Sequence, residues 1–330
     1  MKNIILVDMP VDNNWELKKG IENTTKENWI IKYREGRLST PRVKRILNFI
    51  FFPLSILLFS KADKIVAWQQ FYGLMYCFYN RIFNTNKNVK VTIMTFIYKE
   101  RKGFIGKLYK NFISFCINSK NLNNIIVFSK NEVEYYSKIF PSNKNKFRFL
   151  PLGIPLIEME NLKYNTELNK QNYIFTAGSS NRDYDFLVSA LTGTHYKVKI
   201  ACTGLNINHG DNIEILHNVH GKEMLSYLYN CQIVIIPLKD LEISSGQLML
   251  LQAMQLGKPI IVTNNKGIYD YIENGKTGFI INNTKDELLN KIDILYKKNE
   301  LYNLMSQNEK HIYNIRFSTL ALGRSLGKII

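Results

Sequence analysis

The sequence predicts an α/β protein made of two doubly wound domains, and three observations support this prediction. The length of 330 residues exceeds what one hydrophobic core usually holds, which favours two domains of roughly 150 residues each. Apolar residues make up 45% of the chain and charged residues 22%, as in folded globular proteins. In both halves, short β-rich runs alternate with spacers of helix length, and this alternation is typical of parallel strands joined by crossover helices.

The expected strands are runs rich in β-branched and aromatic residues. Two prolines and a glycine interrupt the alternation in Phe149–Leu156, so we place the domain boundary there, after residue 152. In the first half the runs are residues 3–9, 29–33, 64–68, 89–96 and 124–129, and in the second half they are residues 173–178, 196–204, 232–238, 259–264 and 278–282.

The cysteines and the N-terminal residues indicate a reduced, cytoplasmic setting. The four cysteines form no CxxC pair and accompany no histidine cluster with ligand spacing, which argues against a zinc site and a disulfide framework. The apolar run Asn3–Val7 soon meets Asp8 and Pro10, so it is too short for the core of a signal peptide.

The net charge of +17 is concentrated in the first half of the chain. Residues 1–150 hold 26 Lys and Arg against 10 Asp and Glu, whereas residues 151–330 hold 18 against 17. This asymmetry predicts a polyanionic partner for the first half, either a membrane leaflet rich in anionic lipid or a nucleic acid. A nucleic-acid-binding protein is the alternative interpretation of this charge. The chain shows no RNP-like aromatic pair, no helix-turn-helix signal and no zinc knuckle, so we expect no nucleic acid as the partner.

A serine-glycine turn precedes an apolar helix in the stretch Glu242–Asn265. Ser244, Ser245 and Gly246 would present backbone N–H groups there, and the positive end of the helix dipole would point at the same place, which is how proteins bind phosphate. The alternative is that the serines only cap the helix.

The order of motifs around this turn resembles that of a known family. The turn, a helix ending in QAMQLGKP, the strand IIVTN and the segment GIYDYIENGKTGFII follow one another as in the retaining, family-4-like nucleotide-sugar glycosyltransferases, in particular the bacterial exopolysaccharide and capsule type. The resemblance runs from Tyr173 to Phe317, and FTAGSSNRDYDFL also matches the opening of the family's donor domain. It implies the GT-B fold, with two Rossmann-like doubly wound domains facing a cleft. Residues 1–152 would bind the acceptor, residues 153–316 would bind the donor, and residues 317–330 would form a helix packing back on the first domain.

The resemblance also implies a donor site for a UDP- or GDP-type nucleotide sugar, without metal or other cofactor. Arg182, Glu242 and Ser245 would act in catalysis, with Arg182 holding the diphosphate. Three departures from the family pattern, Ser179 for an arginine and Ser244 and Gln252 for two acids, leave open a catalytically silent protein that only binds a sugar nucleotide. Arg182 has the alternative role of an ion-pair partner for Asp183 or Asp185. The donor-binding residues would be Gly178, Ser179, Ser180, Arg182, His220, Ser244, Ser245, Gly246, Gln247 and Gln252.

Two stretches of the first half could contact a membrane. The apolar run from residue 46 to 59 is too short to span a bilayer and contains Pro53, so it is either a core helix or a membrane contact. A second helix is expected over residues 104–116, and it either lies on an anionic leaflet or packs on the sheet. Its apolar face would hold Phe104, Ile105, Leu108, Tyr109, Phe112 and Ile113, opposite Lys107, Lys110 and Asn111.

Together with the family resemblance, these stretches imply a peripheral glycosyltransferase on the inner face of the plasma membrane that acts on a lipid-linked bacterial glycan. For the acceptor we expect residues at strand ends of the first domain, facing the expected cleft. They are Trp68, Gln69, Gln70 and Lys99.

Overall fold

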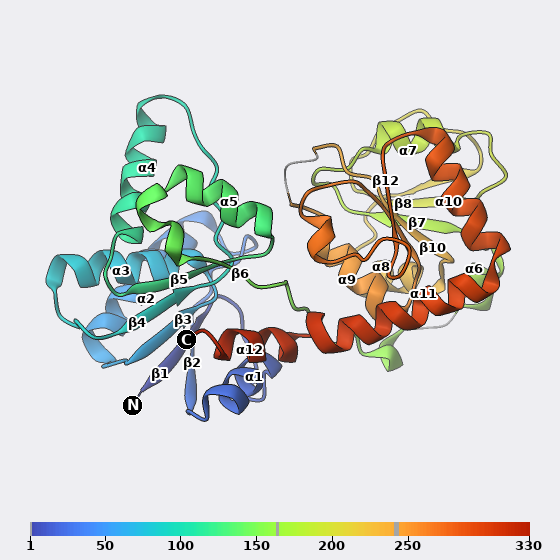
Figure 1. Cartoon of the computed structure of the whole chain (residues 1–330). Helices are drawn as coiled ribbons and strands as arrows, with labels where there is room; N and C mark the ends of the chain where they lie inside the picture. Colours follow the sequence, from blue (N-terminus) through green and yellow to red (C-terminus); the bar gives the residue numbers. More distant parts are fainter. Residues whose placement is uncertain (1, 163–164, 241–243) are drawn as a thin grey trace. The chain divides into compact units, whose positions relative to one another are not determined.

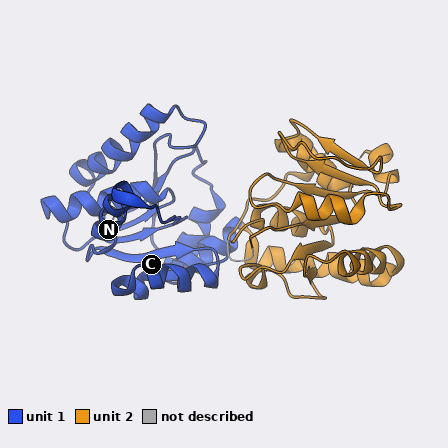
Figure 2. Ribbon diagram, turned by 90° about the horizontal axis from the view of Figure 1, so that it is seen from above, with its two compact units in different colours: residues 1–151, 319–330 blue, residues 152–318 orange. Residues whose placement is uncertain are grey.

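Figure 1 shows the computed structural model of the chain, which describes residues 2–162, 165–240 and 244–330. The chain forms two compact units (Figure 2). Unit 1 consists of Met1–Pro151 together with Thr319–Ile330, and unit 2 of Leu152–Ser318. The boundaries expected from the sequence, after residues 152 and 316, lie within two residues of these.

Unit 1 contains a six-stranded sheet, in which every neighbouring pair is parallel, in the order β2-β1-β3-β4-β5-β6. The five predicted strands are present. The sixth strand, β6, was not predicted, because three residues are too few to show the alternation of apolar and polar side chains that marks a strand. The strands are β1 (Asn3–Val7), β2 (Trp29–Tyr33), β3 (Lys64–Ala67), β4 (Lys90–Ile93), β5 (Leu122–Val127) and β6 (Phe147–Phe149). The helices are α1 (Glu16–Thr25), α2 (Arg42–Phe59), α3 (Gln70–Phe83), α4 (Gly103–Ile117), α5 (Lys130–Ile139), the 3₁₀ helix η1 (Pro141–Lys146) and α12 (Thr319–Gly327).

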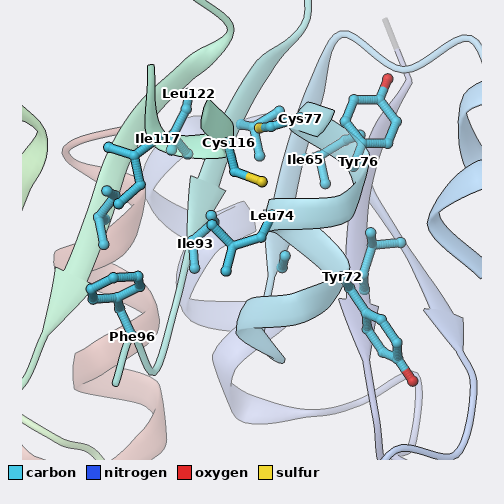
Figure 3. Close-up of a cluster of buried hydrophobic side chains, with 14 of the residues drawn as sticks. Ile65, Tyr72, Leu74, Tyr76, Cys77, Ile93, Phe96, Cys116, Ile117 and Leu122 are labelled. Atoms are coloured by element: carbon cyan, nitrogen blue, oxygen red, sulfur yellow. The ribbon is translucent and has the colours of Figure 1, made fainter. Parts of the chain in front are cut away.

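Alternate side chains of β1 enter two cores on opposite faces of this sheet. Ile4 and Leu6 belong to the core that α2, α3 and α4 cover, whereas Ile5 and Val7 belong to the core that α1 and α12 cover. Figure 3 shows the first of these cores, with the side chains of α3 lying over β3 and β4. Both faces of the sheet are therefore buried, as the parallel arrangement requires.

The last helix, α12, lies in unit 1 against α1. A Cβ atom on Gly20 would lie 2.5 Å from the carbonyl oxygen of Leu320, and one on Gly323 would lie 2.3 Å from that of Leu17. Because glycine has no Cβ, these two positions let the helix backbones approach closely.

The apolar run from residue 46 to 59 forms most of α2, which continues through Pro53. Phe52 and Ile56 face the core, but an apolar stripe on the same helix is exposed, including Val43 and Phe51 at 71% and 59%. One face of α2 is thus part of the core, and a membrane contact through the exposed stripe stays a prediction. Within the described residues, no helix is both long enough and apolar enough to cross a membrane.

The predicted helix over residues 104–116 is present as α4, and the burial of its apolar side chains changes along its length. Phe104, Ile105 and Leu108 are 75%, 73% and 53% exposed, while Ile113 is buried. The first turns of α4 extend away from the sheet, so they have no core to pack against (Figure 1).

Unit 2 has the same architecture, with a parallel six-stranded sheet in the order β12-β11-β10-β7-β8-β9. Here the unpredicted strand is β9, a short edge strand. The strands are β7 (Ile174–Ala177), β8 (Val198–Ala201), β9 (Ile213–Leu216), β10 (Ile233–Ile236), β11 (Ile260–Thr263) and β12 (Phe279–Ile281). The helices are α6 (Thr166–Lys170), α7 (Tyr184–Leu191), α8 (Gly221–Asn230), α9 (Gln247–Leu256), α10 (Lys285–Lys297) and α11 (Asn299–Ile312), with the short helical turns η2 (Met159–Asn161), η3 (Ile268–Asp270) and η4 (Tyr313–Phe317).

Candidate functional site

The loop after β7 contains a glycine over which an arginine side chain folds. Gly178 has φ of +109°, and a Cβ atom there would lie 3.1 Å from Nη2 of Arg182. Nε of Arg182 donates to the carbonyl oxygen of Ala177 at 3.2 Å, and Nη1 donates to that of Ser180 at 2.9 Å. These contacts hold the guanidinium at the carboxyl end of β7, the edge of a parallel sheet where α/β proteins bind ligands.

Arg182 is a half-buried cation that forms no ion pair with any described residue. Asp183 instead caps α7, since its Oδ1 accepts from the backbone N–H of Phe186 at 3.0 Å, and Asp185 is exposed, 4.0 Å from Nζ of Lys239. The alternative in which Arg182 pairs with one of these aspartates is therefore wrong. Burial lowers the pKa of Arg182 from its usual value. A cation in this situation favours an anionic ligand.

The turn before α9 is capped by a glycine. Gly246 has φ of +85° and occupies the N-cap position of α9, so the alternative in which a serine caps this helix is wrong. Ser245 Oγ accepts from Nδ2 of Asn181 at 2.8 Å, and Ser244 Oγ accepts from the side-chain amide of Gln247. The amides of the first turn of α9 and the positive end of its dipole point out of this end of the helix.

Asn181 joins the arginine loop to the serine turn. It has φ of +53°, and besides its bond to Ser245, Nδ2 donates to the carbonyl oxygen of Asp240 at 3.0 Å, while Oδ1 accepts from the Asp240 N–H at 2.7 Å. A Cβ atom at Gly246 would lie 3.8 Å from Nη1 of Arg182. The cation and the amino end of α9 are thus neighbours. The sequence analysis missed Asn181, although asparagine in a tight loop is a known signal for a left-handed backbone.

A cavity of about 320 Å³ opens beside this loop at the carboxyl edge of the sheet. Five of the predicted donor-binding residues line it, and His220 Nε2 lies 3.2 Å from Oγ1 of Thr203, a residue that the sequence analysis missed. The predicted lining residues are Gly178, Ser179, Arg182, His220 and Gln252, and further ones include Cys202, Thr203, Val219, Met224 and Leu248. The geometry therefore places residues from the loops after β7 and β8 and from α8 and α9 around one space.

The other predicted donor-binding residues do not line this cavity. Ser245 bonds to Asn181, and Gly246 lies near Arg182, so both residues are neighbours of the cavity. The carbonyl oxygen of Ser180 accepts a hydrogen bond from the guanidinium of Arg182. Ser244 and Gln247 bond to each other. Glu242, predicted to act in catalysis, lies outside the described residues.

Among the described residues, no group of three or more His, Cys, Asp or Glu side chains is arranged to hold a metal ion. Asp183 and Asp185 form an Asp-x-Asp tripeptide, a pattern that holds a metal-bound diphosphate in another transferase fold. Besides capping α7, Asp183 accepts from Nδ2 of Asn283 at 3.1 Å. This carboxylate therefore has two structural partners.

Two of the predicted acceptor residues in unit 1 have structural roles. Gln69 Oε1 accepts from the N–H of Phe71 at 3.1 Å and so caps α3. Gln70 Oε1 accepts from the N–H of Ile97 at 2.9 Å, which fixes the loop after β4. Both side chains are half-buried.

The other two predicted acceptor residues differ in their surroundings. Trp68 is half-buried after β3, with its ring 5.5 Å from that of Trp15 in an edge-on contact. Lys99 is exposed in the loop after β4. The sequence analysis missed Trp15 and also Asp8, whose Oδ2 accepts from Nε2 of Gln69 at 3.4 Å. Asp8 directly follows β1, and a polar residue at the carboxyl end of a parallel strand is a sequence signal for a binding site.

Comparison with known proteins gives one family match. Residues 161–312 match the sequence model of the family described as Glycosyl transferases group 1. No curated protein matches the chain.

Solved structures resemble the whole chain at low sequence identity. HepE from Anabaena, in complex with UDP-glucose, has a TM-score of 0.62 and 13% identity over 99% of this chain and 98% of its own. Sucrose-phosphate synthase from Thermosynechococcus elongatus has a TM-score of 0.67 and 12% identity over 99% and 97%. WaaG, a glycosyltransferase involved in lipopolysaccharide biosynthesis, has a TM-score of 0.59 and 13% identity over 99% and 99%. At these identities the likeness concerns the fold.

Proposed function

We propose that this chain, a glycosyltransferase of the GT-B fold with a group 1 domain at residues 161–312, moves a sugar from a UDP- or GDP-type donor to a lipid-linked bacterial glycan. The observation that carries the proposal is the half-buried Arg182, which has no ion pair among the described residues and is held over Gly178 beside a cavity and next to the amino end of α9. HepE was solved with UDP-glucose, which supports a donor of this kind.

The arrangement suits the departure of a nucleoside diphosphate. When the bond between the anomeric carbon and the diphosphate oxygen breaks, its electron pair stays on the diphosphate, which gains negative charge. Arg182 and the first amides of α9 would stabilise that charge. His220 and Gln252, on the wall of the cavity, can hydrogen-bond donor hydroxyls. The reaction would proceed with retention of the anomeric configuration and without a metal ion, as in the family-4-like enzymes that the motifs resemble.

Unit 1 would carry the acceptor and the membrane contact. It holds 28 Lys and Arg against 10 Asp and Glu, whereas unit 2 holds 16 against 17. The exposed Phe104, Ile105 and Leu108 of α4 lie within a few residues of Arg101, Lys102 and Lys107, which are also exposed. Cations next to exposed apolar side chains favour the interface of an anionic bilayer. We therefore propose a peripheral enzyme of exopolysaccharide or capsule synthesis on the cytoplasmic face of the plasma membrane, and the likeness to WaaG supports a lipid-linked acceptor.

Calorimetry with UDP, GDP, CMP and dTDP and their common sugars tests the donor. We expect one nucleoside diphosphate to bind, and its sugar to be transferred to a membrane glycan extract at the same rate in excess EDTA as in magnesium. Loss of turnover in EDTA would contradict the metal-independent reaction. Binding without turnover would instead favour a catalytically silent protein, and absence of any binding would contradict the donor site.

Sedimentation with vesicles of phosphatidylcholine and phosphatidylglycerol tests the membrane contact. We expect Phe104→Ser/Ile105→Ser to lower the vesicle partition coefficient by about 10²–10⁴-fold, because each of the two apolar side chains contributes roughly 1.5–3 kcal/mol when fully buried in the interface and 1.4 kcal/mol is tenfold. Binding of the wild type should also fall with added salt.

The matched control is Leu304→Ser/Ile315→Ser, which removes two apolar side chains of unit 2 that are 55% and 56% exposed. This variant should bind vesicles like the wild type. Equal losses in the two variants would show that α4 is not the contact.

A further inference from the structure

A second cavity, of about 410 Å³, lies in unit 1 at the opposite edge of the sheet from the usual ligand side. Trp29, Lys64, Lys90 and Leu122 line it, and each is the first residue of a strand. Since all strands of this sheet are parallel, these residues mark its amino edge. Ligands of α/β folds normally bind at the carboxyl edge, so this cavity is separate from any acceptor site there.

The wall of this cavity is strongly basic. Five cations line it, none of the lining side chains is acidic, and Lys64 is paired with Glu27 at 2.7 Å. Lys90, Lys120 and Arg148 are exposed, and their side chains form no ion pair or hydrogen bond with the described residues. Three cations of like charge around one space repel one another, and a bound anion would relieve that repulsion.

The remaining cation and a hydroxyl are held in fixed positions. Nζ of Lys146 donates to the carbonyl oxygens of Ile117 and Ser119 at 2.7 and 2.8 Å, which fastens it to the rim. Thr92 Oγ1 is buried and accepts from Nδ2 of Asn124 at 3.3 Å, so its own proton is available as a donor. The cavity thus combines exposed cations with donors that hydrogen bonds hold in place.

From this geometry we infer that the cavity is a second anion site, which binds a compact ligand carrying two linked phosphate groups. One phosphate monoester carries about −1.5 to −2 charges at neutral pH, so two linked phosphates would balance the three exposed cations that have no ion pair within the described part of the chain. A volume of about 410 Å³ also exceeds the needs of a single phosphate and falls within the range of small-molecule sites.

The diphosphate could be soluble or could belong to a lipid. The exposed turns of α4 that would contact a membrane begin on the carboxyl side of the sheet, because α4 follows the loop that leaves β4. The cavity opens at the amino edge, and we therefore assign it to a soluble diphosphate. This inference goes beyond the proposed function and does not depend on the donor site.

The test uses the full chain with Arg182→Ala, which removes the main cation of the donor cavity. Pyrophosphate is titrated by calorimetry into this protein and into the same protein with Lys90→Gln/Lys120→Gln/Arg148→Gln. We expect binding in the first and a loss of at least about tenfold in affinity in the second. The control, Lys19→Gln/Lys32→Gln/Lys285→Gln, removes three exposed charges away from the cavity and should retain the affinity.

A parallel arm measures sedimentation with phosphatidylcholine vesicles that carry a polyprenyl diphosphate. If the triple cavity variant binds these vesicles like the control while losing pyrophosphate, the ligand is soluble; if it loses the vesicles as well, the site also takes the lipid diphosphate, against our assignment. Absence of pyrophosphate binding in the Arg182→Ala protein, or equal losses in cavity variant and control, would overturn the site. Donor turnover by the cavity variant in an otherwise wild-type chain reports separately on the proposed function and should be unchanged.

Discussion

Arg182→Ala is expected to lower kcat/KM for the nucleotide-sugar donor by about 10²–10³, which is the effect of removing one preorganised donor from a developing anion. The guanidinium is half-buried, has no carboxylate partner among the described residues, and is oriented by hydrogen bonds to two backbone carbonyls. Because the charge on the leaving diphosphate grows as the glycosidic bond breaks, most of the loss should appear in kcat. The kcat/KM of Arg182→Lys should lie between those of wild type and Arg182→Ala, because lysine keeps the positive charge but lacks the planar guanidinium with its paired N–H donors. Initial rates at saturating acceptor measure the effect.

Arg316→Ala is the matched control for this substitution. Arg316 is the other arginine of unit 2, is exposed, and also donates to a backbone carbonyl, that of Asp270 at 3.3 Å. It lies outside the cavity lining, so its removal should leave kcat/KM within about threefold of wild type. If Arg182→Ala changes the rate no more than Arg316→Ala does, the assignment of the donor site is wrong.

Glu309→Met is expected to stabilise the protein at pH 8 by about 1–3 kcal/mol, the usual cost of a buried polar group without partners. Glu309 is completely buried on α11, and neither carboxyl oxygen has a hydrogen-bond partner of good geometry among the residues that the structure describes. Burial raises its pKa well above the usual value, and the backbone amide of Ile260 and Lys310 offset this only in part. Urea unfolding of wild type and variant measures the difference in free energy.

The pH dependence follows from the direction of this shift. Between the ordinary carboxyl pKa of the unfolded chain and the raised pKa of Glu309 in the folded protein, the folded state binds more protons than the unfolded state. Stability therefore falls as pH rises through that interval.

The stability gained by Glu309→Met should thus be larger at pH 8 than at pH 5. Glu309→Gln should also remove the fall of the unfolding free energy with rising pH. Glu300→Gln, on the exposed start of the same helix, is the control and should change stability by less than about 0.5 kcal/mol. A Met variant less stable than wild type at pH 8 would contradict the account.

Most of the fold could be predicted from the sequence because its main strands are buried on both faces. Continuous apolar runs such as the one at β10 (Ile233–Ile236) stand out against the helix-length spacers around them. The two missed strands, β6 and β9, are edge strands of three and four residues that contain exposed charged residues, Arg148 and Glu214. Such strands form because a neighbouring strand offers hydrogen bonds, and the sequence carries no local signal of that.

The candidate donor site could be predicted only in part. Gly178 and Arg182 were accessible from the sequence because a glycine at a strand end and a nearby arginine are local features. Asn181 was missed because its role depends on Ser245 and Asp240, about 60 residues away in the chain. The sequence also does not show whether an aspartate pairs with Arg182. Asp183 is engaged instead in capping α7, and only the folded structure reveals that contact.

By itself the sequence determined the α/β class, the two-domain organisation, the concentration of positive charge in the first half and the order of motifs in the second, because each of these is a property of local pattern or of counting. The tertiary structure alone decided which cations remain unpaired, which apolar side chains of α2 and α4 face solvent, and that the first residues of distant strands converge on one basic cavity. These properties depend on contacts between residues far apart in the chain, and local pattern does not encode such contacts.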